Sequence, residues 1–293
     1  MAEQHWIEIA SDGLRAAINP FGAELSSLKD GEGRELMTDA DPAFWTGRAP
    51  LLFPIVGKLN GDAYRVDGKR YPLPQHGFAR KQMFLLTEKL EDRARFLLTD
   101  NEATRAVYPF AFALEAAFVL QGATLVMTIT VTNRGTTDMP ASFGFHPAFA
   151  WPLPYGAPRE AHRIEFAHDE PASLAAIIPG GTIGEERWPS PLEGRILKLA
   201  DADFARDALV WDELVSQSLV YGPEQGAQLL VEFPDTPMLG IWTKPGARFL
   251  CIEPWHGIAD PHGFTGEIWD KPGILRFAPG EARNFSMRVT LRT

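Results

Sequence analysis

The strongest constraint in this sequence is a recurring pattern of short segments in which apolar and polar residues alternate, separated by turn residues. In the clearest segment, 124–133, every second residue is large and apolar: Leu125, Met127, Ile129 and Val131. Alternation with a period of two is typical of a β-strand with one buried face. A doubly wound α/β fold would need helices of about ten or more residues between its strands, and that periodicity is missing. The sequence therefore predicts an all-β protein, a large antiparallel β-sandwich with few short helices.

The predicted elements cover most of the chain. Strands are expected at 6–11, 13–20, 24–30, 93–101, 112–120, 124–133, 218–222, 227–233, 238–243, 248–254, 273–280 and 284–293. Short helices are expected at 42–45 and 101–107, and the Pro- and Gly-rich segment 151–190 is interpreted as a long excursion from the sandwich. Because no linker interrupts the pattern, residues 1–293 are predicted to form one domain.

Charge and composition exclude several classes of protein. The 293 residues are 45% hydrophobic and carry a net charge of −10, which favours a globular chain and disfavours nucleic acid or an anionic membrane as partner. A single cysteine, Cys251, rules out a disulfide within the chain and a cysteine-rich zinc site. No apolar run is long enough to span a membrane, and residues 1–13 do not resemble a signal peptide. We expect a cytoplasmic protein, a monomer or homodimer.

Three peptides place ionisable groups among apolar residues: 71–80 (YPLPQHGFAR), 142–153 (SFGFHPAFAWPL) and 249–263 (FLCIEPWHGIADPHG). A charge that is buried without a partner is costly, so such groups are either paired or functional. The chain also contains 19 Phe and 8 Trp together with 26 Gly and 24 Pro, a composition that suits a β-rich protein with an aromatic sugar pocket. These peptides are the candidates for the functional site.

Glu253 and His146 are candidates for acid–base chemistry. In the strand 248–254, Glu253 shares a face with Phe249 and Cys251, so apolar neighbours would raise its pKa and suit it to act as a general base. Histidine is the side chain suited to donating or accepting a proton near neutral pH. The alternatives are structural: a carboxylate at a strand end paired with an arginine, and a core histidine bonded to a carbonyl.

Other polar residues allow weaker interpretations. His76 precedes a glycine that permits close approach of a ligand, but a turn histidine fits as well. Arg80 is either a sugar clamp or a salt-bridge partner. His256 and His262 lack the helical i, i+4 spacing of a metalloprotease, so no metal site is predicted. Cys251 is interpreted as an inert thiol in a strand.

The chain resembles the aldose 1-epimerase (galactose mutarotase-like) family, and in particular its bacterial LacX-like branch. The resemblance covers nearly the whole chain, in the peptides NPFGAELSSLKD, APLLFPIVGKLNGDAY, YPLPQHGFAR, FGFHPAFAWPL, DALVW, IEPWHGIADP and GILRFAPGEA. It implies a large antiparallel β-sandwich with an open cleft. It also implies an isomerase that interconverts the α and β anomers of an aldose without metal or cofactor.

The resemblance also implies roles for particular residues. His76 matches a histidine that binds the sugar near its ring and anomeric side, His146 matches the general acid and Glu253 the general base. Asp207 is matched to an aspartate that holds sugar hydroxyls. Lys58 stands where many mutarotases have an arginine, which keeps the charge but loses the bidentate fork.

Aromatic residues are the remaining candidates for the site. Trp242, Trp255 and Phe78 are predicted to stack on apolar sugar faces, although a core position suits each of them equally. Trp255 replaces the glutamine that family members usually have two residues after the base, so the resemblance leaves the identity of the sugar open.

Three other functions are consistent with the sequence. Lys58 and Arg80 would suit an anionic sugar, phosphorylated or sulfonated. A glycoside hydrolase would need two carboxylates, for which Glu253 with Asp207 or Asp235 are available. A non-catalytic carbohydrate-binding protein on the same scaffold is the third possibility.

Overall fold

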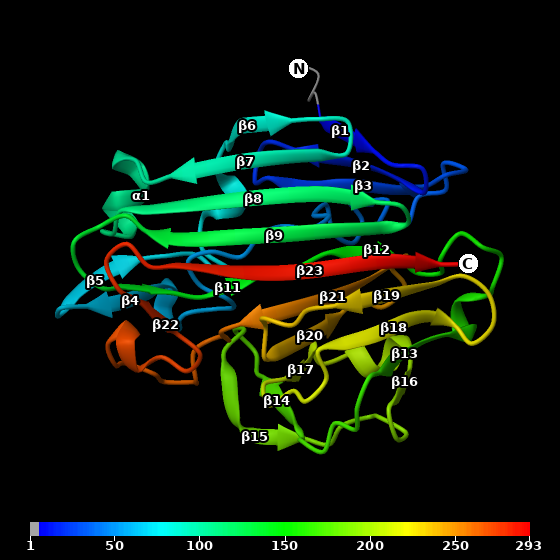
Figure 1. Ribbon diagram of the computed structural model, residues 1–293. Coiled ribbons are helices and arrows are strands. Elements are labelled where there is room, and N and C mark those ends of the chain that lie inside the picture. The colour runs from blue at the N-terminus through cyan, green and yellow to red at the C-terminus, as the bar shows by residue number, and fades with distance from the viewer. Residues whose placement is uncertain (1–5) are drawn as a thin grey trace.

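The computed structural model describes residues 6–293, and nearly all its regular structure is β (Figure 1). Residues 1–5, part of the segment for which no signal peptide was predicted, lie outside the described residues. Across 6–293, no helix combines the length and the apolar character that crossing a bilayer requires. The predicted fold class, an all-β antiparallel sandwich, is confirmed.

The largest sheet has nine antiparallel strands and runs across the upper part of Figure 1 into the lower right. In spatial order it contains β16 (Ile196–Lys198), β13 (His162–Phe166), β18 (Ser218–Pro223), β19 (Gln228–Glu232), β23 (Ala282–Arg292), β9 (Thr124–Asn133), β8 (Phe112–Gln121), β7 (Arg93–Thr99) and β6 (Leu85–Lys89). The strand latest in the sequence, β23, therefore lies in the middle of this sheet, between β19 and β9.

The second sheet has seven strands. Its path contains β11 (Phe143–Gly144), β21 (Phe249–His256), β20 (Met238–Trp242), β17 (Leu209–Trp211), β14 (Leu174–Ile177) and β15 (Ile183–Trp188), and β12 (Ala148–Ala150) pairs with β21 off this path. Smaller sheets join β1 (Ile7–Ala10), β2 (Leu14–Asn19) and β3 (Glu24–Asp30), then β10 (Met139–Ala141) with β22 (Leu275–Phe277), and β4 (Ala63–Val66) with β5 (Lys69–Pro72).

Helices are short. The α-helix α1 (Glu102–Val107) confirms one predicted helix, and Asn101 caps its start by accepting a hydrogen bond from the Thr104 N–H. Single 3₁₀ turns occur at η1 (Asn60–Asp62), η2 (Ala79–Lys81), η3 (Arg159–Ala161), η4 (Asp201–Phe204) and η5 (Ile268–Asp270).

Two predictions about elements are wrong. Residues 42–45 form turns and not a helix, because Asp41 accepts hydrogen bonds from the N–H groups of Ala43 and Phe44 and closes the chain locally. The segment 151–190 is not an excursion, because it supplies β13 to the larger sheet and β14 and β15 to the smaller one. Its prolines and glycines lie in the stretches before, between and after these strands, except Gly184, which lies in β15.

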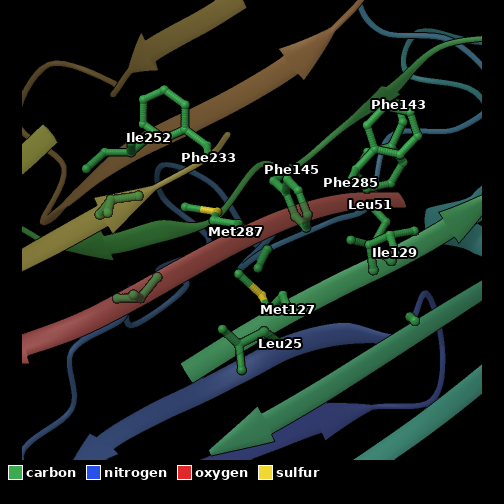
Figure 2. Close-up of a cluster of buried hydrophobic side chains, with 14 of the residues drawn as sticks. Leu25, Leu51, Met127, Ile129, Phe143, Phe145, Phe233, Ile252, Phe285 and Met287 are labelled. Atoms are coloured by element: carbon green, nitrogen blue, oxygen red, sulfur yellow. The ribbon is translucent and has the colours of Figure 1, made fainter. Parts of the chain in front are cut away.

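One hydrophobic core joins the two large sheets. The alternation in β9 is confirmed, since Met127 and Ile129 point inward and pair in register with Met287 and Phe285 of β23. Figure 2 shows these four side chains beside residues of β21, β11 and β3 in the same cluster. Burying such side chains is the main source of stability, at about 1.5–3 kcal/mol each. It also fixes β21 at the base of the candidate site.

Candidate active site

A cavity of about 290 Å³ lies over the seven-stranded sheet. Five ionisable residues from distant parts of the sequence line it: His76, Arg80, His146, Asp207 and Glu253. All five were candidates from sequence. Its volume is near the lower end of small-molecule pockets, about 300–1,000 Å³, which suits a ligand the size of one sugar ring.

Glu253 lies on the inner strand β21, and strand alternation decides which way it faces. Leu250 and Ile252 pack into the main core, whereas Phe249, Cys251 and Glu253 lie on the opposite face of the strand, as predicted; of these three, Glu253 lines the cavity and the other two pack in a small apolar cluster beside it. Glu253 is 2% exposed. Its burial, with a further contribution from the nearby Asp207 carboxylate, raises the pKa of Glu253 well above its usual value.

His146 lies in the link between β11 and β12. The adjacent backbone is bonded to β21 on both sides, because Phe145 N–H donates to Pro254 and Ile252 N–H donates to Pro147. This brings His146 Nε2 to 3.2 Å from Glu253 Oε2. Burial lowers the pKa of His146 to about 3. A proton donor and a proton acceptor thus touch at one wall of the cavity.

His76 is held in a defined orientation by Gly57. The His76 N–H donates to the Gly57 carbonyl at 2.9 Å, and the Gly57 N–H donates to His76 Nδ1 at 3.1 Å. Because Nδ1 accepts, the neutral ring carries its proton on Nε2. Burial, and then the neighbouring His146 and Arg80, lower the pKa of His76 far below its usual value. The residue is therefore a neutral hydrogen-bond donor, in a left-handed backbone conformation with φ of 64°.

Arg80 brings positive charge to the cavity. Its Nη2 donates to the Gln75 carbonyl at 2.9 Å, and its buried Nε has no hydrogen-bond partner. Within residues 6–293, no carboxylate lies within ion-pair distance of this guanidinium, so the described residues give no support to a structural salt bridge.

Asp207 lines the same cavity with an unusual backbone, at φ of 120°. Its Oδ1 accepts a hydrogen bond from the next residue, Ala208, at 2.7 Å. A positive φ is costly for a residue other than glycine and persists only where the surroundings impose it. The turn thus holds a carboxylate at the cavity wall, where it is available to hydroxyl groups.

Trp255 and Trp242 both line the cavity, as predicted. The Trp255 ring lies over Gly240 of β20 and Gly144 of β11, where an added methyl carbon would come within 2.6 Å of the ring. The two glycines on the strands flanking β21 thus make room for a flat indole.

Two predicted site residues lie elsewhere. Phe78 packs in the main core, edge-on to Phe53, and does not line the cavity, so its assignment as a sugar-stacking residue is wrong. The residue follows a turn, where strand alternation does not indicate a direction. Lys58 is also outside the cavity lining, because its ammonium pairs with Asp62 at 2.6 Å.

Other residues of the site were missed. The Trp45 ring stacks on His146 at 5.0 Å between centroids, and Gln75 also lines the cavity. Ile177 and Ile183 form part of its apolar wall and come from β14 and β15, in the segment that was interpreted as an excursion. Neither strand alternates, since β14 is apolar throughout (LAAI) and β15 is mostly polar (IGEERW), so strand periodicity offered no signal here.

The structure does not bring together the residues of the alternative sites, a histidine metal site and a carboxylate pair that includes Asp235. The ring of His256 packs against Phe285, whereas His262 lies near Thr182, so these histidines do not form a metal site. Asp235 is exposed and accepts a hydrogen bond from the Ser286 N–H, so Asp207 is the one named carboxylate left to accompany Glu253 in a hydrolase.

Comparisons with known proteins agree on one family. The model of the family described as aldose 1-epimerase matches residues 5–276. The chromosomal protein LacX of Lactococcus lactis is 32% identical, over 97% of this chain and 99% of that protein.

Solved structures show the same architecture. A galactose mutarotase related enzyme from Lactobacillus acidophilus has a TM-score of 0.90 and is 30% identical, with 99% of this chain and 98% of that chain covered. A galactose mutarotase-like protein from Lactobacillus casei has a TM-score of 0.92 and is 28% identical, with 98% and 100% covered.

Proposed function

Because this chain belongs to the aldose 1-epimerase family, we propose that it is a mutarotase that interconverts the α and β anomers of a hexose or hexose derivative. The observation that carries the proposal is the contact between His146 and Glu253, 3.2 Å apart at the wall of a cavity sized for one sugar ring. Anomerisation needs one proton removed from the anomeric hydroxyl and one delivered to the ring oxygen, and these two groups supply both transfers.

Both groups begin the proposed reaction uncharged. Burial favours a neutral imidazole and a protonated carboxyl group. Transfer of the carboxyl proton across the 3.2 Å contact gives a Glu253 carboxylate and a His146 imidazolium. The carboxylate then takes the proton from O1 while the imidazolium protonates the ring oxygen, the C1–O bond of the ring breaks, and the aldehyde forms. The pair is neutral again, and rotation about C1–C2 followed by the reverse steps gives the other anomer.

His76, Asp207 and the indoles would hold the sugar during these steps. The Nε2–H of His76 is a fixed donor for a sugar oxygen, and the Asp207 carboxylate is an acceptor for hydroxyl groups. Trp255 and Trp242 offer flat apolar surfaces to the C–H faces of a sugar ring. We propose that the protein acts in the cytoplasm, as one domain.

The test compares the anomerisation rates of wild type and the Glu253→Gln variant, measured by polarimetry or saturation-transfer NMR. The substrate panel is glucose, galactose, their 6-phosphates and a sulfonated hexose. Loss of one positioned acid–base group should lower the rate by about 10²–10⁴-fold. Glu193→Gln, at an exposed glutamate outside the cavity, is the matched control and should retain the wild-type rate. Wild-type protein that binds these sugars without anomerising them would indicate a carbohydrate-binding protein, and release of aryl aglycones would indicate a hydrolase.

A second candidate is a mutarotase for an anionic sugar, favoured by the Arg80 guanidinium in the cavity, whose buried Nε has no hydrogen-bond partner. A phosphate or sulfonate group would add a negative charge beside the guanidinium and accept a hydrogen bond from Nε. Removing one partner of a buried charge pair costs about 2–5 kcal/mol, so Arg80→Met should lower kcat/KM for the anionic sugar roughly 30-fold or more. The rate with the neutral parent sugar should change far less. Equal losses for both sugars would contradict this candidate.

A further inference from the structure

A third metal-ligating side chain lies beside the proposed acid–base pair. Cys251 precedes Glu253 by two residues on β21, so the two side chains share a face, and His146 lies over them from the link between β11 and β12. One donor atom from each of these three residues lies within 4.8 Å of the other two. All three side chains are buried, and Cys251 is 0% exposed, behind the residues that line the cavity.

Nitrogen, sulfur and oxygen donors in one cluster are the set that zinc prefers. Zinc sites that keep an exchangeable position use three protein ligands at about 2.0–2.3 Å. The 3.2 Å between His146 and Glu253 already matches two ligands of one ion, and small side-chain rotations would bring the sulfur into range. The fourth position would face the cavity, where water has access.

Charge balance also favours a divalent ion at this cluster. Burial raises the pKa of the Cys251 thiol and of the Glu253 carboxyl group, so both hold a proton in the free protein and binding of the ion would release both protons. The thiolate and the carboxylate then carry two negative charges beside a neutral imidazole, and a divalent cation leaves no net charge to bury. Magnesium and calcium prefer oxygen ligands, and this cluster offers a single carboxylate. The ion that fits is therefore thiophilic.

The surroundings of the cluster favour reversible binding of the ion over permanent, high-affinity binding. Resident zinc sites usually fix each histidine ligand through a hydrogen bond from its second ring nitrogen. Here His146 Nδ1 is buried without a hydrogen-bond partner. The cluster thus has the donors of a zinc site but lacks the support that gives such sites their highest affinity.

We propose that His146, Cys251 and Glu253 form a binding site for Zn²⁺, and that the bound ion inhibits the enzyme by occupying both members of the acid–base pair. The inhibition rests on the proposed mutarotase function, whereas the binding does not. Zinc is here an inhibitor and not a cofactor, because His146 and Glu253 are free for proton transfer only without it.

Binding is tested on the metal-free full chain by calorimetry with Zn²⁺ and by absorption with Co²⁺. We expect one ion per chain and a thiolate-to-cobalt charge-transfer band. Cys251→Ser and Cys251→Ala should abolish the band. They should also weaken Zn²⁺ binding by more than the roughly 10–100-fold that loss of an outer-shell partner costs. His262→Gln, at a histidine outside the cluster, is the control and should bind zinc as the wild type does.

Inhibition is tested separately, by anomerisation with and without Zn²⁺ or Mg²⁺. Zn²⁺ should compete with the sugar and Mg²⁺ should have no effect. The Cys251 variants should keep wild-type anomerisation within a few-fold and require at least about ten-fold more Zn²⁺ for inhibition. Thermal melts check that both variants are folded.

The outcomes separate the two proposals. Zinc binding that depends on Cys251 in a protein that anomerises no sugar would overturn the mutarotase proposal and leave the metal site standing. Anomerisation by wild type, with zinc affinity unchanged in both folded Cys251 variants, would overturn the metal site and leave the enzyme standing.

Discussion

At neutral pH the buried carboxyl group of Glu253, proposed as a catalytic group, lowers the stability of the folded protein. Burial raises its pKa above the usual value of 4.5, so the folded state holds a proton that the unfolded state releases. The stability from this group is fully present below pH 4.5 and is lost as the pH rises through the folded pKa, at about 1.36 kcal/mol per unit of pKa difference. The effect is local to one side chain, so a single substitution isolates it.

We therefore expect Glu253→Gln to gain stability relative to wild type as the pH is raised. Glutamine does not ionise, so the variant avoids the cost of keeping a buried carboxyl group protonated above pH 4.5. Thermal melts of both proteins at pH 5 and pH 8 measure the difference. A difference in Tm that stays constant or shrinks toward pH 8 would show that the raised pKa is wrong.

The pH dependence of the rate should show no ordinary histidine titration. The His146–Glu253 pair needs one shared proton, and burial lowers the pKa of His146 to about 3 while raising that of Glu253. kcat/KM, corrected for the uncatalysed reaction, should stay flat through pH 6–7 and fall on the alkaline side as the pair loses its proton. An inflection near pH 6.5 would show that His146 is not desolvated in this way.

At the residue scale, sequence predicted directions well inside strands and poorly outside them. Alternation correctly placed Cys251 and Glu253 on one face of β21. It had no means of placing Phe78, whose backbone is not extended, or of showing that Lys58 pairs with Asp62. His146 and Glu253 are more than a hundred positions apart in the sequence, so their contact could be expected only from the resemblance to a family.

At the element scale, a buried ion pair supports one wall of the cavity. Lys271, after η5, donates to Asp260 at 2.9 Å and to the Ile258 carbonyl at 2.6 Å. Asp260 also accepts from the Asn60 N–H, which ties residues 258–260 to η1. Ile258 and Ala259 line the cavity, so this network positions a wall of the site.

Lys271→Met should destabilise the protein by about 3–5 kcal/mol, because it leaves the buried Asp260 carboxylate without its cation. Urea unfolding measures the loss. Lys198→Met is the matched control, since it breaks an exposed pair with Glu193 and should cost less than about 1 kcal/mol. Equal effects in the two variants would mean that the Lys271–Asp260 pair is as well solvated as a surface pair.

Most strands of the main sheets could be predicted from sequence. One face of such a strand packs on the core, which makes apolar and polar residues alternate, as in β9. β14 and β15 were not recognised, because prolines and glycines surround them and neither alternates: β14 is four apolar residues long and almost fully buried, and β15 is mostly polar. The helix expected at 42–45 does not form for a different reason: the Asp41 carboxylate accepts a hydrogen bond from the Ala43 N–H, which favours a turn in a segment this short.

At the scale of the whole molecule, both large sheets contribute to one core, so we expect a single cooperative unfolding transition. Scanning calorimetry measures this through the agreement of the calorimetric and van't Hoff enthalpies. Two resolved transitions would contradict the prediction that residues 1–293 form one domain.

The place of β23 between β19 and β9 has a consequence for biosynthesis. As the polypeptide leaves the ribosome, at about 5–20 residues per second, every other strand of the nine-stranded sheet emerges before residues 282–292. Until then, β19 and β9 each present an open edge to the crowded cell, and such edges invite aggregation. We therefore expect nascent chains to be open to edge-to-edge pairing until residues 282–292 fill the gap between β19 and β9.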